Sequence, residues 1–115
     1  FGDRVVQIIQ NTLTLDLSVY FEGPCIDLAI IDACHNTSYV MNDFLKVKSF
    51  VKPNGLVMFH DTHPSMESHL MGSYAACMFL RQRGFDIRQL EGTWWALWSP
   101  DRLFFKSAKK SSAVR

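Results

Sequence analysis

Short apolar runs separated by amphipathic stretches occupy most of this 115-residue chain. Residues 4–10 (RVVQIIQ), 25–32 (CIDLAIID) and 56–60 (LVMFH) are rich in aliphatic and β-branched side chains, and each run is short enough to predict a strand. The second and third runs are almost continuously apolar, which is typical of parallel strands covered on both faces. The pattern therefore predicts a sheet with a largely buried centre.

Two helices are predicted between and after these strands. Asn36, Thr37 or Ser38 can cap the first helix, and Lys52-Pro53-Asn54-Gly55 is predicted to end it in a turn. Its apolar stripe consists of Val40, Phe44, Val47 and Val51, flanked by Met41 and Leu45.

Pro64 and Ser65 are predicted to open the second helix, and Gly84 to stop it. One face of this helix is expected to carry Leu70, Met71, Tyr74, Ala75 and Met78. Residues 86–90 and 93–98 are strand-like, and the Glu91-Gly92 link suits an antiparallel hairpin. Alternating strands and helices within about 60 residues imply a parallel sheet with right-handed crossovers, so the fold class is α/β.

Composition and charge restrict the function further. The chain is 48% apolar and 13% aromatic, which favours one packed domain, placed at residues 1–105. A formal net charge of +1 gives no overall field favouring nucleic acid or a membrane surface, so neither is expected as a partner. Residues 106–115 contain Lys and Arg but no acid, and we expect a basic, poorly ordered tail there.

Cysteine usage and the lack of long apolar segments suggest a cytoplasmic protein. Cys25, Cys34 and Cys77 are odd in number and form no C-x-x-C pair, so neither disulfides nor a zinc knuckle is indicated. A reducing compartment fits this usage best. No apolar stretch approaches the length of a membrane span, and no leader pattern opens the chain. Because the first residue is Phe1, we expect a piece of a longer protein.

Two aspartates form the main candidate site. Asp32 and Asp61 each end an apolar strand, 29 residues apart, which is about one strand-helix-strand unit. If these strands are neighbours, their ends lie about 5 Å apart, where two carboxylates can hold one cation. The alternative is that each aspartate caps the helix that follows it.

Histidines surround these aspartates. His35, on the loop three residues after Asp32, can reach the same space and act as a base, or it is an ordinary loop residue. His60 is a second candidate, with hydrogen bonding in the core as its alternative. His69 is expected to be a surface or packing residue. Trp94, Trp95 and Trp98 line a substrate pocket or, more simply, pack under the helices.

The segment from Ile26 to Thr62, IDLAIIDACHNTSYVMNDFLKVKSFVKPNGLVMFHDT, resembles the second half of class I S-adenosylmethionine-dependent O-methyltransferases. The likeness is to the metal-dependent branch that contains catechol and sugar O-methyltransferase-like enzymes. It covers residues 1–62 by motif and residues 63–100 by the order of elements. It implies a partial Rossmann-like class I methyltransferase fold: a mostly parallel sheet with an antiparallel C-terminal hairpin, lacking the N-terminal glycine-rich half.

The resemblance also implies a site and a reaction. Asp32, Asp61 and Thr62 correspond to metal ligands, with Mg²⁺ or another divalent cation as the expected ion. Threonine is a weaker ligand than Asp or Asn, so His35, His63 or water would complete the site. His35 corresponds to the catalytic base, and Asn11, Thr12 and Ala33 are the residues corresponding to the S-adenosylmethionine site. The implied reaction is O-methyl transfer to a hydroxyl of a small molecule or sugar.

The chain lacks the glycine-rich G-x-G loop of this family. Residues 4–10 would correspond to a strand whose neighbours precede the chain, so the isolated chain is expected to bind S-adenosylmethionine weakly and to be inactive alone. The alternatives are a start that folds differently, or a non-catalytic α/β half-domain that pairs through its sheet edge with a partner or a second copy. A phosphoacceptor receiver domain is excluded, because it needs paired acids early in the chain and a Lys ending a later strand.

Overall fold

The computed structural model describes residues 4–32, 36–63, 72–101 and 105. These form a four-stranded sheet, two α-helices and two short 3₁₀ turns. The main elements are β1 (Ile26–Ile31), α1 (Thr37–Val47), β2 (Val51–His60), α2 (Gly72–Gln82), β3 (Arg88–Gln89) and β4 (Trp95–Trp98).

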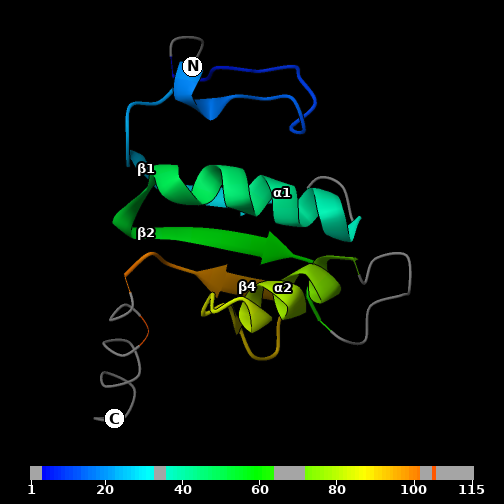
Figure 1. The fold of residues 1–115 in the computed structure, drawn as a ribbon. Coiled ribbons are helices and arrows are strands. Elements are labelled where there is room, and N and C mark those ends of the chain that lie inside the picture. The colour runs from blue at the N-terminus through cyan, green and yellow to red at the C-terminus, as the bar shows by residue number, and fades with distance from the viewer. Residues whose placement is uncertain (1–3, 33–35, 64–71, 102–104, 106–115) are drawn as a thin grey trace.

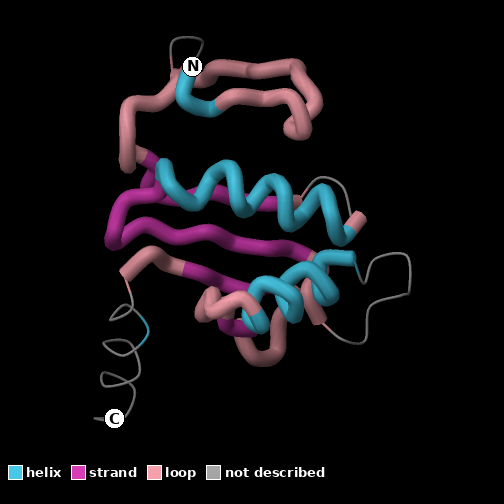
Figure 2. Tube along the Cα trace, in the orientation of Figure 1, coloured by secondary structure: helices cyan, strands magenta, loops and turns pink. Residues whose placement is uncertain are grey.

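The strand order is β1-β2-β4-β3. β1 and β2 are parallel, whereas β4 is antiparallel to both β2 and β3. The two helices contact one another and lie on the same side of the sheet (Figure 1; Figure 2). The α/β class and the antiparallel C-terminal hairpin are thus confirmed, whereas the expectation of a mostly parallel sheet is wrong for the described strands, because only the β1–β2 pairing is parallel. Among the described helices, none is long and apolar enough to cross a membrane.

The core fills the space between the helices and the sheet. Phe44 of α1 is fully buried at its centre, with ring centroids 5.4 Å from Phe59, 5.1 Å from Phe85 and 4.9 Å from Trp98. The last two contacts are edge-on, the arrangement that aromatic quadrupoles favour. Trp98 therefore packs under the helices.

The start of α1 and the end of α2 follow local rules. The Asn36 side chain accepts a hydrogen bond from the Ser38 amide at 3.0 Å and caps α1. Gly84 has φ +97°, a left-handed conformation that favours glycine. The Phe85 amide reaches the Leu80 carbonyl and the Gly84 amide the Arg81 carbonyl, which together form a Schellman motif at the end of α2.

The buried face of α2 differs from the expected one. It consists of Ser73, Ala76, Cys77 and Leu80. Tyr74 and Ala75 are only partly buried and Met78 is exposed, while Leu70, Met71 and the proposed start at Pro64 and Ser65 lie outside the described residues. The buried residues share the spacing of one helical face. The Thr37 hydroxyl, which donates to the Gly72 carbonyl at 3.1 Å, joins the two helices.

β2 begins five residues earlier than predicted. Residues 52–55 lie within the strand instead of a separate turn, and the register with β1 shifts between Ile26 (opposite Val51) and Leu28 (opposite Leu56). Gly55 permits this irregularity, because a Cβ atom there would lie 2.8 Å from the Ile26 carbonyl oxygen. The turn-forming composition of this segment therefore produces a bulge.

Residues 4–10 do not form the predicted strand. They run as coil at the edge of the molecule, with Val5, Val6 and Ile9 exposed (Figure 2). No described strand accepts them as a neighbour, so their β-favouring composition has no ladder to join. The segment after them is attached to α1, where the Lys46 ammonium donates to the carbonyl oxygens of Thr12 and Leu15.

Neither described helix covers the second face of the sheet, contrary to the expectation for the two apolar strands (Figure 1). Leu28 and Ile30 of β1 are 50% and 57% exposed. The hydrophobic run of β1 therefore has apolar side chains on both faces, and the described helices cover only one of them.

Candidate metal centre

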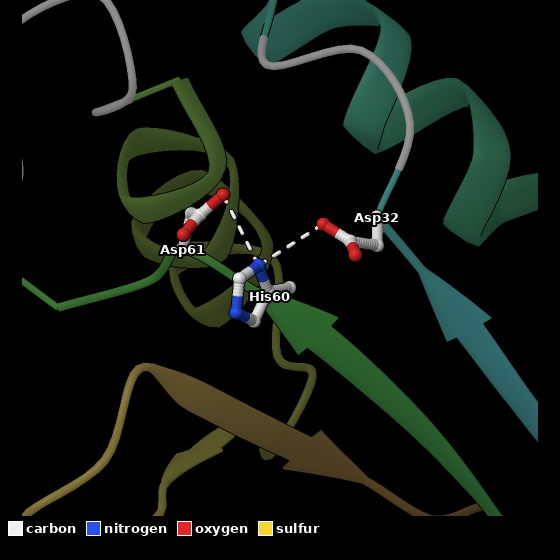
Figure 3. Close-up of side chains that lie close together, drawn as sticks. All are labelled: Asp32, His60 and Asp61. Atoms are coloured by element: carbon white, nitrogen blue, oxygen red, sulfur yellow. Dashed lines mark hydrogen bonds and ion pairs between the residues drawn. The ribbon is translucent and has the colours of Figure 1, made fainter.

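Asp32, His60 and Asp61 meet at the carboxyl ends of β1 and β2 (Figure 3). Each offers one potential ligand atom, and these atoms all lie within 4.8 Å of one another. The cluster thus brings together the two aspartates that were predicted to converge. Open α/β sheets bind ligands at this end of their strands.

The strand register explains how Asp32 reaches the cluster. Ile31 of β1 lies opposite Phe59 of β2, so the following residues, Asp32 and His60, end neighbouring parallel strands. In a regular strand, consecutive side chains point to opposite faces, which would separate His60 from Asp61. Asp61 instead has φ +59°, and this left-handed conformation ends the alternation. Both side chains consequently face the same space.

His60 lies between the two carboxylates. Its Nδ1 is 3.0 Å from Asp32 Oδ1 and 3.1 Å from Asp61 Oδ2 (Figure 3). The tautomer decides what this nitrogen does, because Nδ1 donates a hydrogen bond when it carries the proton and presents a lone pair when the proton is on Nε2. The His60 ring also packs against Trp95, its partner in the β2–β4 register, with centroids 4.4 Å apart.

The three side chains differ in burial. That of Asp61 is 9% exposed, that of His60 27% and that of Asp32 49%. A ligand can therefore approach from the Asp32 side, while Asp61 forms the floor. Two anionic carboxylates and an imidazole at this spacing are a suitable donor set for a divalent cation.

Thr62 has a different local role in the described structure. It is 1% exposed, and its hydroxyl lies 2.8 Å from Gln89 Oε1 and 3.2 Å from the Trp94 carbonyl. Its amide donates to the same Trp94 carbonyl. These contacts join the end of β2 to the C-terminal hairpin. A ligand role for Thr62 stays a prediction.

Of the predicted cofactor residues, Asn11 and Thr12 belong to the described part of the chain. A cavity of about 260 Å³ lies beside Asp32, between β1, α1 and the segment that contains Thr12. Thr12 lines this cavity together with Asp43 and Lys46. The Asn11 side chain accepts a hydrogen bond from the Leu13 amide at 2.9 Å and so stabilises the turn that contains Thr12. His35 and Ala33 lie outside the described residues.

His60 is the member of the cluster that the sequence left ambiguous. Strand alternation favours a hydrogen-bonded core position for His60. That prediction assumes a regular strand backbone as far as Asp61. The left-handed backbone at Asp61 has no clear sequence marker, although Asp tolerates this conformation better than most residues. The adjacent His-Asp pair at a strand end was the only available indication.

The fold and the cluster together define an α/β domain with a polar site at the carboxyl ends of adjacent parallel strands. A family model described as "Methyltransferase domain" matches residues 1–62, a segment that includes the whole cluster. The chain belongs to this methyltransferase family. Its reaction class is therefore methyl transfer, with S-adenosylmethionine as the general methyl donor. Comparisons with curated proteins and with solved structures gave no match.

Proposed function

We propose that this chain forms part of an S-adenosylmethionine-dependent O-methyltransferase that uses a divalent cation to methylate a hydroxyl of a small molecule or sugar. The observation that supports this most directly is the convergence of Asp32 and Asp61 on one site, with ligand atoms within 4.8 Å. The family match supports methyl transfer in general. The oxygen-centred reaction and the cation are our additions.

The roles of the residues follow from their positions. Asp32 and Asp61 would hold the cation, which when bound lowers the pKa of an acceptor hydroxyl. His35 would accept the proton of that hydroxyl. Thr62, at the end of β2, would be a further ligand of the cation. Thr12, on the wall of the cavity beside Asp32, would contact the methyl donor together with Asn11 and Ala33. Most of the rate enhancement would come from aligning donor and acceptor.

Cation binding provides the first test. Calorimetric titration of the chain with MnCl₂ and MgCl₂ should show one site, and Asp32→Asn should weaken binding at least tenfold, since even outer-sphere partners of a metal site contribute about 10- to 100-fold. Asp27→Asn is the matched control, because Asp27 lies on β1, the strand that Asp32 follows, but forms an exposed ion pair with Lys52 at 3.0 Å. Unchanged binding in Asp32→Asn would reject the ligand assignment.

Methyl transfer provides the second test. Transfer from radiolabelled S-adenosylmethionine to vicinal diols should be sensitive to a chelator in a protein that contains this chain and its methyl-donor site. We expect the isolated chain to bind S-adenosylmethionine only weakly. Micromolar binding to the 115 residues alone would contradict that expectation, and chelator-resistant transfer would contradict the role of the cation.

A second candidate function is a non-catalytic half-domain that associates through its sheet. The exposed Leu28 and Ile30 and the unpaired outer edge of β1 within the described sheet favour it. A second copy of the chain is the partner that we propose for this surface. Self-association without any cation uptake would favour this candidate over the enzyme.

A further inference from the structure

We infer that His60 is the third protein ligand of the proposed cation and that its imidazole shifts the preference of the site from Mg²⁺ toward a first-row transition ion such as Mn²⁺. This inference rests on the proposed metal site at Asp32 and Asp61. It adds a ligand that the family resemblance placed elsewhere, at Thr62.

The first argument is position. Nδ1 of His60 already lies 3.0 Å and 3.1 Å from one oxygen of each aspartate, so a cation held by both carboxylates would also lie within reach of this nitrogen. To bind a cation, Nδ1 must present its lone pair, which requires the neutral tautomer with the proton at Nε2. The ring does not need to turn for this, because Nδ1 is already the ring atom that faces both carboxylates.

The second argument is that neighbouring residues hold the ring in place. Trp95 contacts the His60 ring with centroids 4.4 Å apart, and the two residues are paired in the β2–β4 ladder. Such support fixes the direction of a ligand lone pair and strengthens a metal site. His63 is also described, but it is not part of the three-residue cluster.

The third argument is chemical. Mg²⁺ prefers oxygen ligands in near-ideal octahedral geometry and retains several waters, whereas Mn²⁺, a first-row transition ion, accepts carboxylate oxygens and an imidazole nitrogen together. A site with two carboxylates and one nitrogen should therefore bind Mn²⁺ more tightly than Mg²⁺. Replacing the nitrogen with a carboxylate should reduce that difference.

The test compares His60→Glu with the control Asp27→Asn in the full 115-residue chain, because Asp27 is exposed, pairs with Lys52 and is not part of the cluster. Calorimetry with MnCl₂ and MgCl₂ gives the ratio of the two dissociation constants. Electron spin echo envelope modulation of bound Mn²⁺ detects a directly coordinated ¹⁴N nucleus. Wild type and Asp27→Asn should show ¹⁴N modulation and an Mn²⁺ preference of at least about tenfold. His60→Glu should lose the modulation and reduce the preference several-fold. Circular dichroism of each variant verifies folding.

The outcomes separate this inference from the proposed function. If Mn²⁺ binds and Asp32→Asn abolishes binding, but ¹⁴N modulation is absent or persists in His60→Glu, the cation site stands and the role of His60 is wrong. An equal affinity for Mg²⁺ and Mn²⁺ in wild type would also overturn the inference. If wild type binds neither ion, both the inference and the proposed cation fail. Should His60→Glu fail to fold, His60→Gln replaces it with the same expected loss of ¹⁴N coupling.

Discussion

The backbone at Asp61 is the residue-scale feature on which the whole site depends. Its φ of +59° places a non-glycine residue in the left-handed region, which costs about 1 kcal/mol or more and persists only where the surroundings enforce it. In return, the carboxylate is brought to the same side as His60. The site therefore combines a local conformational cost with a functional arrangement, a combination common at binding sites.

Substitutions at Asp61 should separate backbone strain from side-chain loss. Asp61→Ala loses the carboxylate and keeps the left-handed strain, whereas Asp61→Gly loses the carboxylate and removes the strain. Urea denaturation should show Asp61→Gly to be more stable than Asp61→Ala by about 1 kcal/mol, the scale of the left-handed penalty. Both variants should lose cation binding. Equal stability of the two would mean that the strain contributes little.

Cys77 should be chemically inert in the native protein. Burial raises the pKa of its thiol from 9.0 to about 12. Iodoacetamide at pH 8.5 should therefore modify exposed Cys25 and leave Cys77 unmodified until denaturant is added, as peptide mass spectrometry can measure. Rapid native labelling of Cys77 would contradict its burial.

The same shift gives a pH dependence of stability. The folded-state pKa lies above the unfolded value, so the contribution of the neutral thiol is complete below pH 9 and is lost as the pH rises toward about 12. Between these values the unfolded chain ionises and the folded chain does not. Cys77→Ala should reduce the decline in the free energy of unfolding over this range, and an identical decline in the variant would exclude the thiol as a cause.

At the scale of elements, local rules and tertiary packing account for different parts of the structure. Helix ends could be predicted, because Asn36 and Gly84 act through their own backbone surroundings. The buried face of α2 could not, since its large side chains satisfied the same periodicity as its small ones. In the structure Ser73, Ala76, Cys77 and Leu80 are the buried residues of α2, and the helix packs against α1. Residues 4–10 show the same limit, because β propensity without a neighbouring strand forms no strand.

A substitution at Gly55 can test how much the irregularity in β2 contributes to the stability of the chain. An added Cβ atom would lie 2.7 Å from Val51 Cγ1 and 2.8 Å from the Ile26 carbonyl oxygen, and a backbone atom cannot yield as a flexible side chain can. Gly55→Ala should therefore destabilise the chain by about 1 to 3 kcal/mol, the usual range for overpacking.

Asn54→Ala is the control for this substitution, because Asn54 is the exposed neighbour of Gly55 in the same strand. It should change stability by less than about 0.5 kcal/mol. The free energy of unfolding from urea titration gives both values. A Gly55→Ala variant as stable as wild type would show that β1 and β2 can shift apart at this point without loss.

At the scale of the whole molecule, the alternation of strands and helices predicted the α/β class, and the strand-end aspartates predicted where the site lies. Which faces of the sheet are covered could not be predicted. An apolar run such as residues 26–31 does not indicate whether helices pack on one face or on both. The structure shows both helices on one side (Figure 1). The opposite face retains apolar side chains that water contacts.

This uncovered face leads to a prediction about self-association. Leu28 and Ile30 are 50% and 57% exposed on the outermost strand of the described sheet, and burying them against a second copy would remove apolar surface from water at about 25 cal/mol per Å². Sedimentation equilibrium should therefore show concentration-dependent dimerisation of the chain. Leu28→Thr with Ile30→Thr should weaken dimerisation at least tenfold, while β-branched threonine preserves the strand.

Leu45→Thr is the matched control, because Leu45 is 40% exposed but lies on α1, away from the open face of the sheet. It should leave the dimerisation constant unchanged. A chain that stays monomeric at all concentrations, or a double variant that associates as strongly as wild type, would exclude this face as the contact between copies. Cation titration of the same samples then separates the two proposed functions, since an enzyme site binds Mn²⁺ in either oligomeric state, whereas a purely associating half-domain binds none.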